Sequence, residues 1–268
     1  MKDTGGCTPA HVFDTLALAD SPVHRLDPRV KIVATLAFIV AVMSFNRYEL
    51  VALTPFLLFP AVLFSLSALP ARPLLTAVCA AAPFALMVGM FNPVFDHRVI
   101  GHIAGIEVSA GWVSFASILM RFLLTVGAAL LLVATTGMYR TAMALERLAV
   151  PRVFVLQILF VWRYLFVLGD EAAALNRGRV LRSFGRPASV RLFGRLAGGL
   201  LLRTLDRAMR IHRAMLARGF DGTVRFLGDL RLRPADVVFC GGWCLAFAVM
   251  RLVNLPRLLG QLLTGAFS

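Results

Sequence analysis

Long apolar runs alternate with short polar breaks along most of the chain. Four runs occupy residues 31–45, 50–69, 74–92 and 111–136, and two more follow at 152–169 and 236–253. A helix needs about 20 residues to cross a bilayer, with a range of about 17 to 25. Because main-chain groups left unpaired in lipid cost several kcal/mol each, helix is the structure open to these spans. The pattern therefore predicts an all-α integral membrane protein.

Composition supports a membrane protein and locates its charge. The 268 residues are 59% hydrophobic and 16% charged, with a mean hydropathy of +0.80, which is more apolar surface than a soluble core can bury. Residues 139–233 hold 18 arginines and six acidic residues, so this segment carries +12 of the net charge of +14. Retention of positive loops in the cytoplasm explains this excess, and we find no nucleic-acid-binding motif.

The charge distribution also predicts the topology. If the N-terminus is cytoplasmic, four spans return the chain to the cytoplasm near residue 139, where the arginine-rich segment begins. A complete crossing by 152–169 would place the arginines from Arg177 to Arg195 outside, against the positive-inside tendency. We therefore predict one long helix over 152–183 that runs along or partly into the cytoplasmic face. The last apolar run, 236–253, then forms the remaining transmembrane helix.

These arguments divide the chain into four parts. They are an N-terminal cytoplasmic lead (1–30), a four-helix transmembrane part (31–138), a cytoplasmic region of two long amphipathic helices (139–233) and a C-terminal transmembrane helix (234–268). The fold class is thus all-α, with about five transmembrane helices of the usual length.

The second amphipathic helix is predicted within 191–220, where arginines recur every three or four residues opposite leucines and methionines. Gly194 and Gly198 lie four residues apart, a spacing that lets helix backbones approach closely. Ala172, Ala173 and Ala174 offer a small surface on the first helix. We therefore predict a helix crossing at Gly194 and Gly198, with breaks near Gly185 and Pro187 separating the two helices.

A repeated hexamer marks both amphipathic helices. Residues 173–178 and 214–219 each read Ala-x-Leu-x-Arg-Gly. Glycine after a cation is typical of a helix C-terminus, where it adopts a left-handed cap. Capping alone does not explain the repeat, and a planar bidentate cation at a helix end suits a carboxylate in a partner's groove. We favour partner docking over capping.

The chain resembles a known family in several places. Leu26-Asp27-Pro28-Arg29-Val30-Lys31 resembles the motif that precedes the first span in the transmembrane T components of energy-coupling-factor (ECF) importers. The paired Arg-Gly sequences are similar to the two coupling-helix motifs of that family, and residues 150–164 resemble the start of its first long coupling helix. The length and the N-terminal lead look most like the cobalt-type CbiQ family.

The resemblance implies a role and a set of residues. A T component bridges two cytoplasmic ATPase subunits and a substrate-binding membrane subunit, here a cobalt-type S component with or without a small accessory membrane subunit. It sits in the bilayer of the bacterial inner membrane. The ATPase-coupling residues would be Ala174, Arg177, Gly178, Ala217, Arg218 and Gly219, and the family motif residues would be Asp27, Pro28, Arg29 and Lys31. Asn176 departs from the alanine that the family often has.

No cofactor or metal site is expected in this chain. Neither lysine follows a glycine, so a phosphate-binding loop is missing, and ATP and Mg²⁺ would bind to the partner ATPases. The chain is therefore not expected to be an enzyme. Asp96, His97 and His102 share one loop but lack a complete ligand set, so we assign no metal site. Arg121, within the fourth span, is equally consistent with contacting a partner subunit or its own bundle.

Three alternatives remain. A T component for another substrate, such as nickel or a vitamin like biotin, would be distinguished by the neighbouring genes. A membrane-embedded enzyme should place acids or histidines together at a membrane face, and we find none. A self-sufficient carrier should carry polar residues along its spans, which are bare apart from Arg121.

Overall fold

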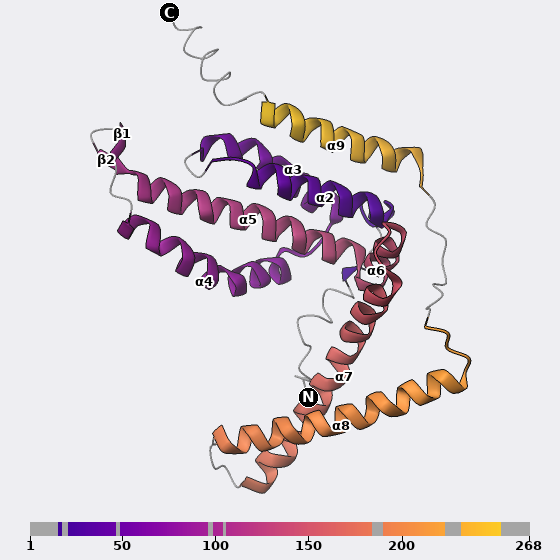
Figure 1. Cartoon of the computed structure of the whole chain (residues 1–268). Coiled ribbons are helices and arrows are strands. Elements are labelled where there is room, and N and C mark those ends of the chain that lie inside the picture. Colours follow the sequence, from indigo (N-terminus) through magenta and orange to yellow (C-terminus); the bar gives the residue numbers. More distant parts are fainter. Residues whose placement is uncertain are drawn as a thin grey trace, which may run out of the picture. The chain divides into compact units, whose positions relative to one another are not determined.

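The computed structural model describes residues 16–17, 21–46, 49–95, 99–103, 106–183, 190–222 and 232–252. In chain order its elements are α2 Pro28–Met43, the 3-10 helix η1 Val51–Leu57, α3 Leu58–Ser67, α4 Ala71–Phe95, β1 Val99–Ile103, β2 Ile106–Ser109, α5 Ala110–Thr136, α6 Met138–Arg147, α7 Arg152–Ser183, α8 Val190–Ala217 and α9 Pro234–Leu252 (Figure 1). The chain is an all-α membrane protein.

The chain divides into two compact units. The first comprises Met1–Ala144 and Asp229–Ser268, and the second comprises Leu145–Gly228. The first unit contains the helices from α2 to α5, most of α6, and α9, whereas the second contains the end of α6 with α7 and α8. The predicted cytoplasmic region, 139–233, includes the whole of the second unit.

Helix α5 lies at the centre of the first unit. It packs against α2, α3 and α4, and α9 packs against α2 (Figure 1). Close contact with α4 is made at Gly89, because a Cβ there would lie 2.8 Å from the ring of Phe115. Asn92 strengthens the same contact by donating a hydrogen bond of 3.1 Å to the Ser114 hydroxyl.

Local sequence explains where these helices begin and end. Asp27 is the N-cap of α2 and Pro28 occupies its first turn, as helix N-termini favour. Ala68 ends α3 with φ of 50°, and Gly137 ends α5 with φ of 72°. Gly137 is also confined by its surroundings, since a Cβ would lie 2.9 Å from that of Ala17.

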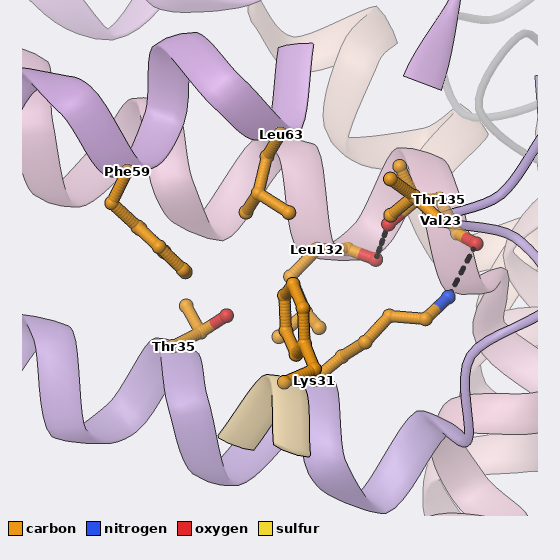
Figure 2. Close-up of a pocket in the computed structure, with 8 residues that line it drawn as sticks. Val23, Lys31, Thr35, Phe59, Leu63, Leu132 and Thr135 are labelled. Atoms are coloured by element: carbon orange, nitrogen blue, oxygen red, sulfur yellow. Dashed lines mark hydrogen bonds between the residues drawn. The ribbon is translucent and has the colours of Figure 1, made fainter. Parts of the chain in front are cut away.

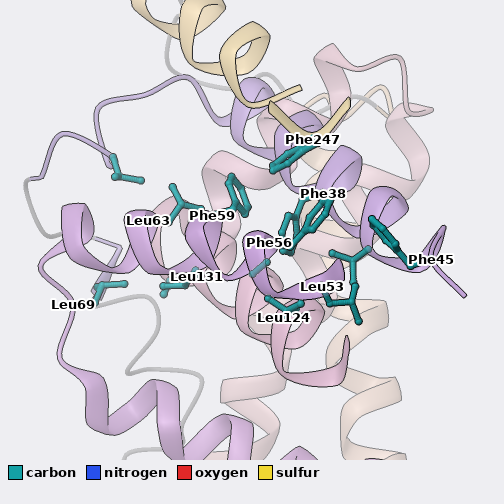
Figure 3. Close-up of a cluster of buried hydrophobic side chains, with 14 residues drawn as sticks. Phe38, Phe45, Leu53, Phe56, Phe59, Leu63, Leu69, Leu124, Leu131 and Phe247 are labelled. Atoms are coloured by element: carbon teal, nitrogen blue, oxygen red, sulfur yellow. The ribbon is translucent and has the colours of Figure 1, made fainter. Parts of the chain in front are cut away.

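The core of the first unit is an aromatic cluster contributed by α2, η1, α3 and α9 (Figure 3). Phe38 is fully buried, and its ring centroid lies 4.7 Å from Phe59, 5.4 Å from Phe247 and 6.1 Å from Phe56. Trp243 closes the cluster on α9, with its ring edge-on to Phe59. Aromatic pairs with centroids 4.5–7 Å apart stabilise beyond their buried area, so this cluster fixes α9 against α2.

The predicted spans correspond to helices, with two differences. Four helices of the described residues are long and apolar enough to cross a membrane: Ala71–Pro93, Ala110–Thr136, Arg152–Ser183 and Pro234–Leu252. The first two predicted spans correspond to α2, which has 16 residues, and to η1 with α3, which are shorter apolar helices. Although α7 is long enough to cross, our expectation that 152–169 does not cross rests on the arginines and stays a prediction.

The loop between α4 and α5 contains structure that the sequence analysis did not predict. Strands β1 and β2 pair antiparallel, from Val99 opposite Ser109 to Ile103 opposite Ile106. The sequences VIGHI and IEVS are rich in β-branched residues and suit strands, whereas the sequence analysis assigned Asp96, His97 and His102 to one loop. Asp96 and His97 lie outside the described residues.

Removing the Phe38 ring should destabilise the bundle. We expect Phe38→Ala to lower the free energy of unfolding by about 3–5 kcal/mol, because it leaves a cavity among packed rings. Leu36→Ala is the matched control on the same helix, since Leu36 is 55% exposed and should change stability by about 0.5 kcal/mol or less. Unfolding of the detergent-solubilised protein measures both, and equal losses would contradict the assigned core.

Candidate functional site

Asp27, in the N-terminal motif, contributes to a buried contact between the start of α2 and the start of α9. The Asp27 side chain caps α2 by accepting a hydrogen bond of 2.9 Å from the main-chain N–H of Arg29. The main-chain N–H of Asp27 donates to Oδ1 of Asp236 at 3.1 Å, and Oδ2 of Asp236 accepts from the N–H of Arg233 at 2.8 Å. One carboxylate therefore binds the first turns of two helices that are more than 200 residues apart in sequence.

Lys31 joins α2 to the end of α5. Its side chain is 4% exposed, and Nζ donates a hydrogen bond of 3.0 Å to the carbonyl oxygen of Thr135 (Figure 2). Asp236 and Asp27 are near enough to interact electrostatically with the ammonium group. A buried lysine is tolerated when its ammonium group is hydrogen-bonded, and the Thr135 carbonyl oxygen provides such a bond here. Lys31 is therefore part of the fold and not a surface charge.

The sequence singled out the motif but not its partners. Pro28 is buried beside Asp27, and Nε of Arg29 lies 3.9 Å from Oδ1 of Asp27. Asp236 and Thr135 were missed because their role depends on contacts distant in sequence. An acidic residue in the first turn of an apolar helix was the available signal for Asp236, since it resembles half of a capping box.

Arg121 contacts its own bundle. Its Nη2 donates to the carbonyl oxygens of Phe45 at 2.9 Å and Asn46 at 2.6 Å, just beyond the C-terminus of α2. Arg251 of α9 binds there too, with Nη2 donating to the Ser44 carbonyl oxygen at 3.0 Å and its guanidinium 4.5 Å from the Phe45 ring centroid. Cations at a helix C-terminus are favoured by the helix dipole, and they satisfy carbonyl groups that lack intrahelical partners.

The second Arg-Gly pair ends α8. The N–H of Phe220 donates to the Met215 carbonyl oxygen and that of Gly219 to the Leu216 carbonyl oxygen, both at 3.0 Å. Gly219 has φ of 79°, so these bonds form a Schellman motif with glycine in the left-handed conformation. Ala217 and Arg218 are exposed at this end. The glycine therefore has a capping role, which leaves the arginine side chain unnecessary for the cap.

The first Arg-Gly pair lies within α7 and near its C-terminus. Gly178 is inside the helix, which continues to Ser183, where the sequence analysis predicts its end. The residues that follow, Arg179-Val180-Leu181-Arg182, can all extend a helix, whereas the predicted break near Gly185 lies outside the described residues. Ala174 and Arg177 are exposed on α7. Capping consequently does not explain Gly178.

Neither hexamer arginine is committed to an internal partner within the described part of the chain. The Arg177 and Arg218 side chains form no hydrogen bond or ion pair with the described residues, whereas Arg179 donates to Asn176 Oδ1 at 3.2 Å. A guanidinium presents five N–H donors in a plane that matches a carboxylate. The two hexamers thus present two exposed cations, one along a helix and one at a helix end.

The crossing of α7 and α8 differs from the prediction. Added Cβ atoms at Gly194 and Gly198 would meet nothing within 4 Å, so these glycines do not bring the backbones together. The helices meet through Glu171, whose carboxylate lies 3.8 Å from Arg203 and 3.5 Å from Arg207. A groove beside these charged side chains is lined in part by Ala174, Gly178 and Leu196.

No cluster of three or more histidine, cysteine or acidic side chains suited to a metal occurs among the described residues. The side chain of His102 belongs to a strand whose side chains are not described. The absence of a metal site therefore stays a prediction for the loop between α4 and α5.

Comparison with known proteins connects these features to cobalt transport. The CbiQ family profile, described as cobalt transport protein, matches residues 19–226, which include the N-terminal motif and both hexamers. The cobalt transport protein CbiQ of Salmonella typhimurium is 31% identical over 158 residues, covering 53% of this chain and 69% of that protein. A putative fused cobalt transport protein CbiMQ of Methanocorpusculum labreanum is 25% identical over 221 residues, covering 79% of this chain and 37% of that protein.

The two hexamer glycines should respond oppositely to alanine. We expect Gly219→Ala to destabilise the end of α8 by about 1–2 kcal/mol, because alanine is strained in the left-handed conformation. Gly178→Ala should instead stabilise α7 by about 0.5–1 kcal/mol, since this glycine is helical and a Cβ has open space. Hydrogen exchange of α7 and α8 peptides in the full chain measures both changes. Changes of the same sign would contradict these assignments.

Proposed function

Because the chain belongs to the CbiQ family of cobalt transport proteins, we propose that it is the transmembrane coupling subunit of an ECF-type importer for Co²⁺. It is a multi-pass membrane component of cobalt transport. In the proposed complex it transmits the ATP-driven movement of two cytoplasmic ATPase subunits to a substrate-binding membrane subunit. The complex resides in the inner membrane, with ATP and Mg²⁺ on the ATPases and no cofactor in this chain.

The observation that carries the proposal is the pair of exposed guanidinium groups at Arg177 and Arg218. They occur in equivalent hexamers on the two long helices of one unit, and two ATPase subunits require two such contacts. Within the described residues, neither guanidinium group donates a hydrogen bond to another residue of this chain. Bidentate pairing with a carboxylate in a groove would give each ATPase a directional contact.

The partner assignment is supported by a relative and by the charge of the second unit. The fused CbiMQ protein joins its CbiQ part to another segment in one chain, which favours a membrane partner for this chain as well. The arginine-rich second unit would lie on the cytoplasmic side, where positive segments are retained and ATP is available.

Replacing both hexamer arginines should separate this chain from its ATPases. We expect Arg177→Ala/Arg218→Ala to abolish co-purification of ATPase subunits from detergent-solubilised native membrane, because truncating a buried charged contact typically costs about 2–5 kcal/mol. Arg163→Ala/Arg213→Ala is the matched control, since it removes the same charge from exposed positions on the same two helices. Mass spectrometry of the co-purifying chains is the measurement.

Two outcomes would count against the proposal. Equal loss of ATPases in both double variants would mean that general charge, not the hexamers, holds the complex. Wild-type protein that purifies alone, under conditions that preserve other membrane complexes, would favour a self-contained carrier or an enzyme.

We expect the substrate-binding membrane subunit, and not this chain, to determine which ion is transported. In proteoliposomes containing the purified complex, uptake of radioactive Co²⁺ should require ATP and should stop with the double arginine variant. Preferential uptake of Ni²⁺ over Co²⁺ by the wild-type complex would keep the coupling role and overturn the cobalt assignment.

A further inference from the structure

The buried cluster of Asp27, Lys31, Thr135 and Asp236 has a particular place along the chain. Thr135 lies in the last turn of α5, directly before α6, and the second unit begins within α6 at Leu145. Asp236 lies in the first turn of α9, which is the first helix after the chain returns from the second unit. The N-terminus of α2 therefore binds both the outgoing and the returning segments.

We propose that this cluster is the mechanical anchor for both connections of the second unit, so that movement of α7 and α8 is passed to the transmembrane bundle. Lys31 anchors the outgoing connection through α5, and Asp236 anchors the returning connection through α9. They are positioning residues, which touch neither substrate nor ATPase. This inference rests on the coupling role proposed above and assigns a function to the N-terminal motif.

The hydrogen bonds of the cluster fix the positions of helix backbones and not only of side chains. Each joins a buried side chain to a main-chain atom: Lys31 Nζ to the Thr135 carbonyl oxygen, and the Asp236 carboxylate to the N–H groups of Asp27 and Arg233. A bond to the main chain fixes the helix backbone itself. Because water is excluded at these buried atoms, rupture would leave charged or polar groups unpaired, which is costly.

Helix α6 packs beside the anchor. It runs from Met138 to Arg147, and residues 148–151 separate it from α7. Ala142 and Ala144 are fully buried, and Arg140 adds a hydrogen bond of 3.2 Å to the carbonyl oxygen of His24, near the cluster. The outgoing connection therefore begins as a packed helix.

The other end of α2 provides a control for this inference. Arg251 also ties α9 to α2, by bonds to Ser44 and a contact with the Phe45 ring. It lies in the last turn of α9, so it is far along the helix from the connection to the second unit. Removing it loosens the same pair of helices without releasing the anchored end.

The test uses the assembled complex in proteoliposomes and measures radioactive Co²⁺ transported per ATP hydrolysed. Lys31→Met and Asp236→Leu are made singly and together, with Arg251→Met as the control. We expect the single variants to lose thermal stability, because each leaves buried main-chain groups without their hydrogen-bond partner. The double variant should lose at least as much, since its apolar side chains bond neither the Thr135 carbonyl oxygen nor the N–H groups of Asp27 and Arg233.

Stability and coupling should separate between the anchor variants and the control. We expect the Co²⁺ to ATP ratio to fall about threefold to thirtyfold in the single and double variants alike, and to stay near wild type in Arg251→Met. A wild-type ratio in the double variant would reduce the cluster to a structural role. An equal fall in Arg251→Met would also overturn the anchor.

Failure of the anchor is distinguishable from failure of the coupling role. The anchor variants should still co-purify with ATPase subunits, unlike Arg177→Ala/Arg218→Ala. Retained ATPases with an unchanged ratio would overturn the anchor alone. Absence of ATPases from the wild-type protein would overturn the coupling role and the anchor with it.

Discussion

The first unit depends on how the two ends of α2 are bonded. A short apolar helix in lipid has terminal main-chain groups that water cannot reach, so the protein itself must satisfy them. Asp236 acts at the N-terminal end, while Arg121 and Arg251 act at the C-terminal end. Because these three side chains come from α5 and α9, satisfying α2 also sets the places of its neighbours. The aromatic cluster then fills the space between helices whose ends are already held.

The charged side chains of the second unit contribute less to its stability, because most of them are exposed. Glu171 pairs with Arg203 and Arg207, whose side chains are 61% and 39% exposed, and exposed ion pairs contribute little to stability. At the end of α8 the main chain caps itself through Gly219, so Arg218 is not needed there. The stability of the unit thus explains little of the arginine excess, which is compatible with the partner docking proposed above.

Sequence alone could predict what depends on local pattern. Among the described residues, the apolar runs located each helix that is long and apolar enough to cross a membrane. The Asp27-Pro28 pair marked the start of α2, and Gly219 marked the end of α8. Contacts between distant segments could not be predicted. One is the bond of Asp236 to Asp27, and another is the pairing of Glu171 with Arg203 and Arg207. The sequence instead favoured a helix crossing at Gly194 and Gly198. Gly178 does not itself end α7, because glycine permits a helix end without requiring one, and the residues after it favour continuing.

The 3-10 helix η1 changes how far a short segment can reach. Such a helix rises about 2.0 Å per residue, against about 1.5 Å in an α-helix. The seven residues of η1 therefore cover about 14 Å and the ten of α3 about 15 Å. Together they approach the hydrocarbon thickness of about 30 Å, which an α-helix of the same length would miss by several ångströms. Tighter winding thus lets a segment that is marginal by residue count match the membrane.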